Sequence, residues 1–329
     1  MDPVPAKVPS SRCRSRTRTP RSRRVLRILV SHPEPRALTD WCEALAQTLD
    51  CAQVEPWRAD SAPADYAVGW AVPTALFPLQ PQLRGFFCAG AGVDDLLAST
   101  AVPAALPLYR LRDAGMAQQM ADYCSAAVLR AVTRQDAYAA QQARGEWREL
   151  PLEAREHWTV GVFGLGALGN AVAERYRLLQ FPVVGCSRQR LDTGAVDFNA
   201  FLQASRVLVL VAPLTPRTRG IIDAAALARL PRGAWLINVG RGALVDEAAL
   251  RAALDSGQLA GAVLDVFARE PLPAGHPFWC HPRVRLTPHA AAYTRIGPAA
   301  VQIAAAIACL ERGGDGALPV DRVDRVRGY

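Results

Sequence analysis

The feature that most constrains this chain is a glycine-rich turn between a short apolar run and a helical segment, at residues 158–170. Gly164, Gly166 and Gly169 follow the spacing G-x-G-x-x-G. Residues 159–163 predict a buried strand, and residues 167–179 predict the helix after it. In such a unit the first glycine permits the tight turn, the second lets the backbone approach a pyrophosphate, and the third lets the helix pack on the strand. The helix N-terminus then directs free amides at the phosphates, so the segment predicts a dinucleotide-binding site.

The length and composition of the chain are typical of a globular protein with about two domains. Half of its 329 residues are hydrophobic, and no apolar run approaches the ~18 residues of a membrane span. Its eight cysteines are scattered and contain no C-x-x-C pair. We therefore expect reduced thiols in a cytoplasmic protein, with neither a disulfide framework nor a metal site.

The formal net charge of +8 is concentrated at the N-terminus, where residues 1–24 hold Lys7 and seven arginines against Asp2 alone and so carry +7. Because the rest of the chain is almost neutral, we expect no nucleic-acid partner for it. Residues 1–24 are also rich in Pro, Ser and Thr and lack apolar periodicity, which predicts a disordered, solvated tail. The alternatives are a nucleic-acid arm, an arginine-rich transit peptide and a twin-arginine signal at Arg23–Arg24. The prolines, the missing amphipathic pattern and the short apolar run at 25–30 favour the solvated tail.

Apolar runs alternate with helical segments along the chain, which predicts doubly wound parallel sheets. In the first half the expected strands are residues 25–31, 67–70 and 85–88, with a helix at 35–49. In the second half they are residues 159–163, 181–186, 207–212, 234–239, 261–266 and 284–287. Residues 113–143 contain one early glycine, no proline and apolar residues at helical spacing, which predicts one long helix connecting two domains. Asp246 is the expected N-cap of a helix at 247–254.

Two features of the first half point to a small ligand. Residues 89–92, Ala-Gly-Ala-Gly, follow an expected strand, and the free amides of such a turn suit a small anion. A plain strand-to-helix turn explains the same residues about equally well. Trp70, at another strand end, is either a side chain that narrows a substrate pocket or an ordinary core residue.

Ser187 and Arg188 follow the strand expected at 181–186. An enzyme that prefers NAD usually has Asp or Glu at this place, about 20 residues past the glycines, to bind the ribose 2′-hydroxyl. Here Ser187 can donate a hydrogen bond, and Arg188, with Arg190 nearby, can pair with a 2′-phosphate. We therefore expect NADPH in preference to NADH; the alternative is a pair of surface arginines in an arginine-rich chain.

Three further polar residues each follow an apolar strand in the second half, namely Arg241, Glu270 and His289. In a parallel sheet the carboxyl ends of the strands converge on one crevice beside the cofactor. An arginine can clamp a carboxylate through two hydrogen bonds. A histidine backed by a carboxylate is oriented and has its pKa raised, so it can protonate an alkoxide as hydride arrives. Together the three residues predict a hydride-transfer site.

These segments together resemble the D-isomer-specific 2-hydroxyacid dehydrogenase family. The resemblance covers residues 25–329 and is carried by GLGALG at 164–169, APLTP at 212–216, NVGRG at 238–242, DVFAREPLP at 265–273 and TPHAA at 287–291. Within the family, the glyoxylate/hydroxypyruvate reductases are most similar at CAGAGVD (88–94), YRLRDAGMAQQMADY (109–123), CSRQR (186–190) and VDRVRGY (323–329).

The resemblance implies a role for each matching residue. Arg241 would bind and polarise a 2-oxo acid, His289 would be the acid/base, and Glu270 would support it. Ala91 and Gly92 would offer backbone amides to the substrate carboxylate. Asp265 would bind the nicotinamide amide. The remaining cofactor contacts that it implies are Ala167, Leu168, Ala212, Pro213, Leu214, Thr218, Val239, Gly240 and Ala291.

The resemblance also implies an architecture of two similar α/β domains. A flavodoxin-like substrate domain would comprise residues 25–124 and 293–329, and a Rossmann domain that binds NADP would comprise residues 125–292, behind the tail at 1–24. Members of the family are usually homodimers that associate through helices of the cofactor domain. The basic tail falls outside the family pattern.

We therefore expect a cytoplasmic NADPH-dependent reductase that converts glyoxylate to glycolate and hydroxypyruvate to D-glycerate. A reductase of another small 2-oxo acid, such as 2-ketogluconate, would use the same scaffold. A dinucleotide-sensing interaction protein is the alternative from a different class, but a sensor would not need Arg241, Glu270 and His289 together.

Overall fold

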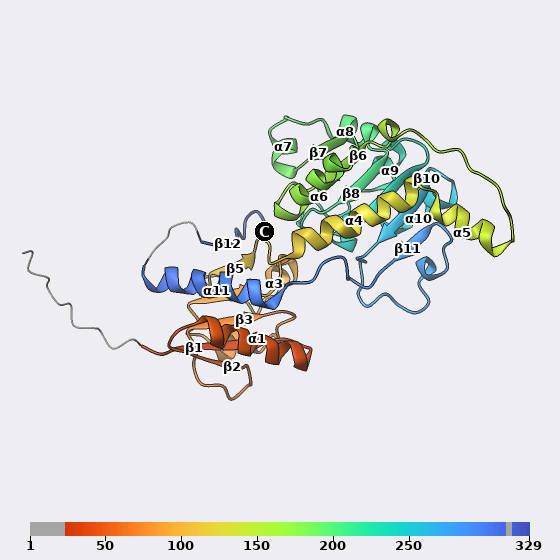
Figure 1. Ribbon diagram of the computed structural model, residues 1–329. Helices are drawn as coiled ribbons and strands as arrows, with labels where there is room; N and C mark the ends of the chain where they lie inside the picture. Colours follow the sequence, from red (N-terminus) through yellow and green to blue (C-terminus); the bar gives the residue numbers. More distant parts are fainter. Residues whose placement is uncertain (1–23, 314–317) are drawn as a thin grey trace, which may run out of the picture.

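The computed structural model describes residues 24–313 and 318–329, which form two six-stranded sheets flanked by helices (Figure 1). In spatial order the first sheet contains β12 (Val320–Arg322), β5 (Leu108–Leu111), β4 (Gly85–Cys88), β3 (Tyr66–Gly69), β1 (Leu26–Ser31) and β2 (Ala52–Pro56). The second contains β11 (Val284–Leu286), β10 (Leu259–Leu264), β9 (Ala234–Asn238), β8 (Val207–Leu210), β6 (Val160–Phe163) and β7 (Val183–Cys186). The predicted α/β architecture with two parallel sheets is confirmed, except that β12 pairs antiparallel with β5. The predicted disorder of residues 1–24 concerns residues that lie, apart from Arg24, outside the described part of the chain.

The strand order locates the crevices of both sheets. In the first sheet β1 lies between β2 and β3, and in the second sheet β6 lies between β7 and β8. The chain therefore adds one strand on one side of β1 or β6 and the later strands on the other side. Ligands of open α/β sheets bind at the carboxyl ends of the strands beside such a switch point. In the second sheet this point lies between β6 and β8, where Gly164 and Ala212 follow the two strands.

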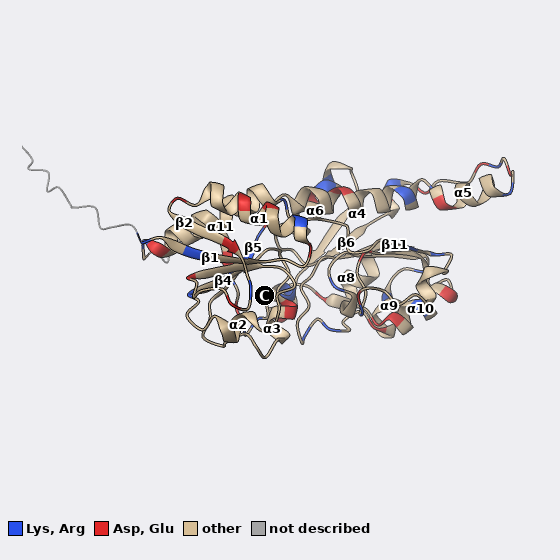
Figure 2. Cartoon of the chain, turned by 90° about the horizontal axis from the view of Figure 1, so that it is seen from below, with Lys and Arg blue, Asp and Glu red and all other residues tan. Residues whose placement is uncertain are grey.

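Helices cover both faces of the sheets (Figure 2). One layer contains α1 (Pro35–Thr48), α4 (Met116–Val132), α5 (Gln135–Ala143), α6 (Ala167–Leu178) and α11 (Ile296–Glu311). The other contains α2 (Leu76–Leu79), α3 (Asp94–Ala98), α8 (Phe198–Ala204), α9 (Ala224–Arg229) and α10 (Glu247–Asp255). The remaining helical segments are α7 (Arg188–Asp192) and the 3₁₀ turns η1 (Arg155–His157), η2 (Gly242–Leu244) and η3 (Pro277–Trp279). Helix α4 packs on α6, and α11 returns to pack on α1, so the chain crosses between the sheets twice.

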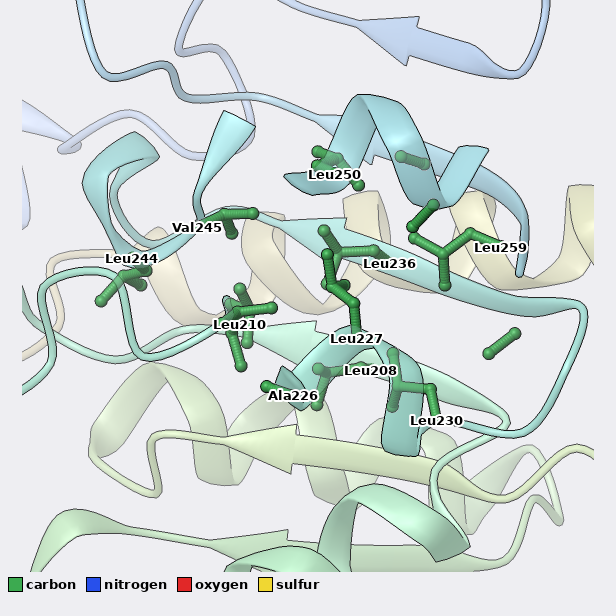
Figure 3. Close-up of a cluster of buried hydrophobic side chains, with 14 of the residues drawn as sticks. Leu208, Leu210, Ala226, Leu227, Leu230, Leu236, Leu244, Val245, Leu250 and Leu259 are labelled. Carbon is green, nitrogen blue, oxygen red and sulfur yellow. The ribbon is translucent and has the colours of Figure 1, made fainter. Parts of the chain in front are cut away.

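The strands are near-continuous apolar runs because both of their faces are buried. On one face of the second sheet, leucines of β8 and β9 meet leucines of α9 and α10 (Figure 3); Leu208, Leu210, Leu227, Leu236 and Leu250 are each at most 1% exposed. Truncation of such a buried leucine to alanine typically costs about 2–5 kcal/mol. This core fixes the strand ends from which the candidate site residues emerge.

The prediction of one long helix over residues 113–143 is wrong, because the segment forms two helices, α4 and α5. Helix α4 ends at Val132, and Arg134 adopts a left-handed backbone with φ of 56°. The Thr133 hydroxyl donates to the carbonyl of Leu129, and Arg130 forms an ion pair with Asp136 across the break. These contacts stabilise a turn that contains neither glycine nor proline.

The carboxylate of Asp246 accepts hydrogen bonds from the amides of Ala248 and Ala249, which confirms it as the N-cap of α10. No helix in residues 24–313 and 318–329 has the length and apolarity needed to cross a membrane. Within the same ranges no cysteine forms a disulfide bond, and no three potential metal ligands are grouped together. The boundaries proposed between the two domains, after residues 124 and 292, stay a prediction.

Candidate active site

The glycine-rich turn joins β6 to α6 at the switch point of the second sheet. Gly164 has φ of +107°, which strongly favours glycine, and a Cβ on Gly169 would lie 1.7 Å from the carbonyl oxygen of Gly164. The third glycine is therefore required for α6 to approach β6. Gly166 and Ala167 are exposed, and a Cβ on Gly166 would meet no atom within 4 Å. The helix N-terminus thus opens onto free space, as an approaching phosphate requires.

The turn after β8 lies directly against the glycine-rich turn. A Cβ on Gly164 would come within 2.6 Å of the amide nitrogen of Ala212. The Thr218 hydroxyl is buried, donates to the carbonyl of Pro213 at 2.8 Å and accepts from the amide of Thr215. Thr218 therefore shapes the 212–218 turn through its hydroxyl, while Pro213 is exposed and Leu214 is half-buried.

Ser187 and Arg188 lie at the end of β7, where Ser187 caps the short helix α7 by accepting from the amide of Arg190. The guanidinium of Arg188 pairs with Asp192 at 3.3 Å, and Arg217 pairs with the same carboxylate at 3.1 Å. Arg217, from the turn after β8, was missed by the sequence reasoning. Its position in the sequence gives no signal, because only the fold brings it to the end of β7.

Arg241 emerges from the turn after β9, which buried side chains hold in place. The side-chain amide of Asn238, 1% exposed, donates to the carbonyl of Arg241 at 2.9 Å and accepts from the amide of Gly240. Val239 is also buried. The Arg241 guanidinium donates through Nη1 to the carbonyl of Gly240 and through Nε to Asp94 Oδ1, both at 2.8 Å. Asp94 follows β4 of the first sheet, so this contact joins a loop of the second sheet to a helix of the first.

Ala91 and Gly92, the residues predicted to bind the substrate carboxylate, lie beside the guanidinium of Arg241. A Cβ on Gly92 would lie 1.5 Å from Nη2 of Arg241, so the two groups are in direct contact. Arg110 donates to the carbonyl of Ala91 at 3.3 Å, and the Cys88 thiol donates to the carbonyl of Gly92 at 3.3 Å. The loop carbonyls are thus engaged by groups of the first domain.

Trp70 lies beside the same loop. A Cβ on Gly90 would meet the Trp70 ring at 2.5 Å, and Trp70 packs partly buried against two hydrophobic clusters of the first domain. The ring therefore supports the loop directly at Gly90. No contact that the structure gives for the described residues joins Trp70 to Arg241.

His289 and Glu270 lie together, with Nδ1 of the imidazole 2.8 Å from Oε2 of the carboxylate. The other oxygen, Oε1, accepts from the amide of Phe267 at 2.9 Å. Because an ionised carboxylate only accepts, Nδ1 carries the proton in this contact and Nε2 is left for a substrate. The side chains of His289 and Glu270 are 40% and 36% exposed, so the pair is open to a ligand.

Asp265, 1% exposed, organises the loop that carries His289. Its carboxylate accepts from the Thr287 hydroxyl at 2.5 Å and from the amides of Ala290 and Ala291 at 2.7 and 2.9 Å. Its carbonyl accepts from the amide of His289. The Thr287 hydroxyl in turn shares a hydrogen bond with Tyr123 Oη, a contact that the sequence reasoning missed.

The electrostatics of the pair favour an ion pair of protonated histidine and carboxylate. The hydrogen bond to Glu270 raises the pKa of His289 above its ordinary value of 6.5, although burial acts in the opposite direction. Burial also acts to raise the pKa of Glu270, but hydrogen bonds from His289 and the Phe267 amide outweigh it and lower that pKa. The charge of Arg241 acts on both groups, so all three share one electrostatic environment.

Comparison with known proteins shows the family to which the chain belongs. Residues 125–291 match the family model for the NAD binding domain of D-isomer specific 2-hydroxyacid dehydrogenases. The chain belongs to this family, which confirms the resemblance drawn from the motifs.

Among curated proteins, the chain is similar to glyoxylate/hydroxypyruvate reductase A of Serratia proteamaculans, with 42% identity over 317 residues. The match spans 92% of this chain and all of the relative. The protein of the same name from Salmonella typhi is 42% identical over 318 residues, with the same coverage.

Two solved structures extend the similarity to the fold. A D-isomer specific 2-hydroxyacid dehydrogenase from Xanthobacter autotrophicus Py2, in complex with NADPH and MES, aligns with a TM-score of 0.84 at 35% identity. That alignment covers 93% of this chain and all of the other. The NADPH-dependent glyoxylate/hydroxypyruvate reductase of Sinorhizobium meliloti, in complex with NADP and sulfate, aligns with a TM-score of 0.83 at 32% identity, over 92% and 100% of the two chains.

Proposed function

We propose that this chain is an NADPH-dependent reductase that converts glyoxylate to glycolate and hydroxypyruvate to D-glycerate. The observation that carries the proposal is the paired His289 and Glu270, which lie in the electrostatic field of Arg241. The names of the relatives supply the substrates, and the family supplies the class of reaction.

The residues present fit NADPH. Gly166 and Gly169 leave a cradle at the start of α6 that added Cβ atoms would alter, and the amides there suit a pyrophosphate. Arg188 and Arg217 share a single carboxylate, Asp192, which leaves an excess of positive charge for a 2′-phosphate. A carboxylate has about four acceptor sites, and Asp265 uses three of them, so one is left for the nicotinamide amide.

The chain's own groups then perform the proton chemistry. Bound NADPH supplies hydride to C2 of the 2-oxo acid. Nη2 of Arg241 and the amides of Ala91 and Gly92 hold the substrate carboxylate. Protonated His289 gives its Nε2 proton to the carbonyl oxygen, which becomes the hydroxyl oxygen of the product. Glu270 stays ionised, keeps the imidazole oriented and stabilises its cation, and His289 regains a proton from solvent.

We further propose a cytoplasmic homodimer that binds neither nucleic acid nor membrane. Helix α5 projects beyond the second sheet (Figure 1), and the segment that leads back from it carries Trp147 and Leu152, which are 101% and 68% exposed. Contiguous exposed apolar surface marks protein interfaces, and Trp147 and Leu152 belong to the same segment. A second copy of the chain is the partner that family membership favours.

A kinetic panel tests the proposal. Glyoxylate, hydroxypyruvate, 2-ketogluconate and pyruvate are each added to the protein with NADPH or NADH, and the loss of nicotinamide absorbance is followed. The proposal expects the highest kcat/KM for glyoxylate or hydroxypyruvate with NADPH. A clear preference for 2-ketogluconate would move the assignment to another substrate on this scaffold. Binding of NADPH without turnover of any 2-oxo acid would instead support a dinucleotide sensor.

A further inference from the structure

The guanidinium of Arg241 is anchored from the opposite domain by Asp94. Arg241 follows β9 of the second sheet, whereas Asp94 begins α3 after β4 of the first sheet. Oδ1 of Asp94 accepts from Nε at 2.8 Å, and the two side chains are only 23% and 19% exposed. Because Nη1 donates to the carbonyl of Gly240 at 2.8 Å, two nitrogens of the guanidinium have fixed acceptors.

The third nitrogen faces the place where the substrate carboxylate is expected. Nη2 lies against Gly92, close enough that a Cβ there would overlap it. The carbonyls of Ala91 and Gly92 are held by Arg110 and Cys88. Nη2 therefore contacts this loop at Gly92. It does not share the acceptors of Nε and Nη1, which are Asp94 and the carbonyl of Gly240.

An arginine that lacks a fixed acceptor at Nε can rotate about several bonds, so its fork is not pre-oriented. We propose that Asp94 is a positioning residue: it holds Nε of Arg241 so that Nη2 faces the substrate carboxylate. Asp94 touches neither substrate nor cofactor and acts through Arg241. This role rests on the proposed function, in which Arg241 binds the 2-oxo acid.

The role is tested by Asp94→Ala, with Asp95→Ala as the matched control. Asp95 is the next residue of the same helix turn, is exposed, and has no ion pair or hydrogen bond among the contacts given for the described residues. A displacement of about 1 Å can cost a factor of roughly 10², so Asp94→Ala should lower kcat/KM for glyoxylate by about 10- to 100-fold. Exposed substitutions usually change energies by less than about 0.5 kcal/mol, so Asp95→Ala should stay within about twofold. Equal loss in both variants would overturn the proposal.

Two readouts separate positioning from a purely structural role. Asp94→Asn retains an acceptor for Nε, and it should recover most of the activity that Asp94→Ala loses. In an Arg241→Ala background, Asp94→Ala should cause less than about twofold further loss, because residues that act through one contact are not additive. The same fold-loss in both backgrounds would show that Asp94 does not act through Arg241. The KM for NADPH and the melting temperature should not change in Asp94→Ala.

A binding measurement tests the role of Asp94 independently of the proposed reductase activity. If the wild-type protein reduces no 2-oxo acid, the proposed function fails. The Asp94 role is then tested with oxalate, whose binding to wild type, Asp94→Ala and Asp95→Ala is measured by calorimetry in the presence of NADPH. Weaker binding in Asp94→Ala alone supports the positioning role. No difference among the three proteins overturns it.

Discussion

His289 is held in an unusual backbone conformation by the residues around it. Its φ of 52° lies in the left-handed region, where histidine is tolerated more readily than most side chains. Its amide donates to the carbonyl of Asp265, and the Asp265 carboxylate fixes the next two amides. The loop thus presents the imidazole to Glu270 with its orientation already set, which lowers the entropic cost of catalysis.

The contact with Glu270 predicts a shift in the pH profile. The pKa of His289 is raised above 6.5 when folded, so the reductive rate should be highest at low pH and fall as pH rises through that raised pKa. Glu270→Gln removes the carboxylate charge and should move the fall to lower pH. The pH dependence of kcat/KM for glyoxylate, measured with both proteins, checks this. A variant profile that coincides with the wild-type profile would contradict the assigned role of Glu270.

The same linkage affects stability. A histidine with a raised folded pKa contributes stability that is fully present below the unfolded pKa and is lost as pH rises through the folded value. The His289–Glu270 pair is more than a third exposed. Its contribution to the free energy of unfolding should therefore be small, and its effect should appear in catalysis.

Arg188 is expected to determine the choice of cofactor. Arg188→Ala should raise the KM for NADPH and leave the KM for NADH nearly unchanged, because NADH has no 2′-phosphate. Arg219→Ala, an exposed arginine of the neighbouring turn, serves as the control. The ratio of kcat/KM for the two cofactors is the measurement, and an unchanged ratio in Arg188→Ala would remove it from the cofactor site.

Among the elements, the βα unit at Gly164 was the most predictable. Its strand, turn and helix carry consistent local signals, and the structure places β6 and α6 where the sequence indicates. The short strands β2, β5 and β12 were missed, because each is five residues or fewer and lacks a distinctive pattern. The break between α4 and α5 was missed because no helix-breaking residue marks it. Local side-chain contacts of Arg130 and Thr133 stabilise it instead.

The candidate site shows the same division. Arg241, Glu270 and His289 each follow a strand, so local sequence was enough to select them. Asp94, Arg217 and Tyr123 were not selected, since each meets its partner only through the approach of distant elements. Sequence patterns report which residues end a strand and do not report which strands share a crevice.

The packing of α6 on β6 yields a prediction at this scale. In Gly169→Ala the new Cβ would lie 1.7 Å from the Gly164 carbonyl, so the helix must shift and the amide cradle with it. We expect a loss of about 1–3 kcal/mol in the free energy of unfolding and a marked weakening of NADPH binding. Gly275→Ala meets no atom within 4 Å and is the control. Thermal melting and NADPH titration distinguish the two, and equal behaviour would contradict this account of the third glycine.

For the whole molecule, two sheets of the same strand order contribute side chains to one candidate site. Arg241, which follows β9, and Asp94, which begins α3, form an ion pair that links the two sheets. The C-terminal strand β12 returns to the first sheet, so the end of the chain completes the domain in which it began. The site therefore requires the folded assembly of both domains.

The proposed homodimer predicts a measurable mass. Each chain has a mass of 35.5 kDa, so light scattering should give twice that value for the wild-type protein. Trp147→Asp places a charge on the protruding segment and should shift the mass toward that of the single chain. Val326→Asp, at a residue 98% exposed elsewhere on the molecule, should leave it unchanged. A dimer that persists in Trp147→Asp would place the interface elsewhere.

The central claim is that the protein reduces a 2-oxo acid with His289 as proton donor. The turnover of glyoxylate with NADPH, measured in wild type and in His289→Ala, tests it most directly. Wild type should oxidise NADPH on addition of glyoxylate. Because general acids usually contribute about 10²–10⁴-fold, His289→Ala should be slower by at least about 10²-fold while still binding NADPH. Turnover in the variant within about twofold of wild type would contradict the account.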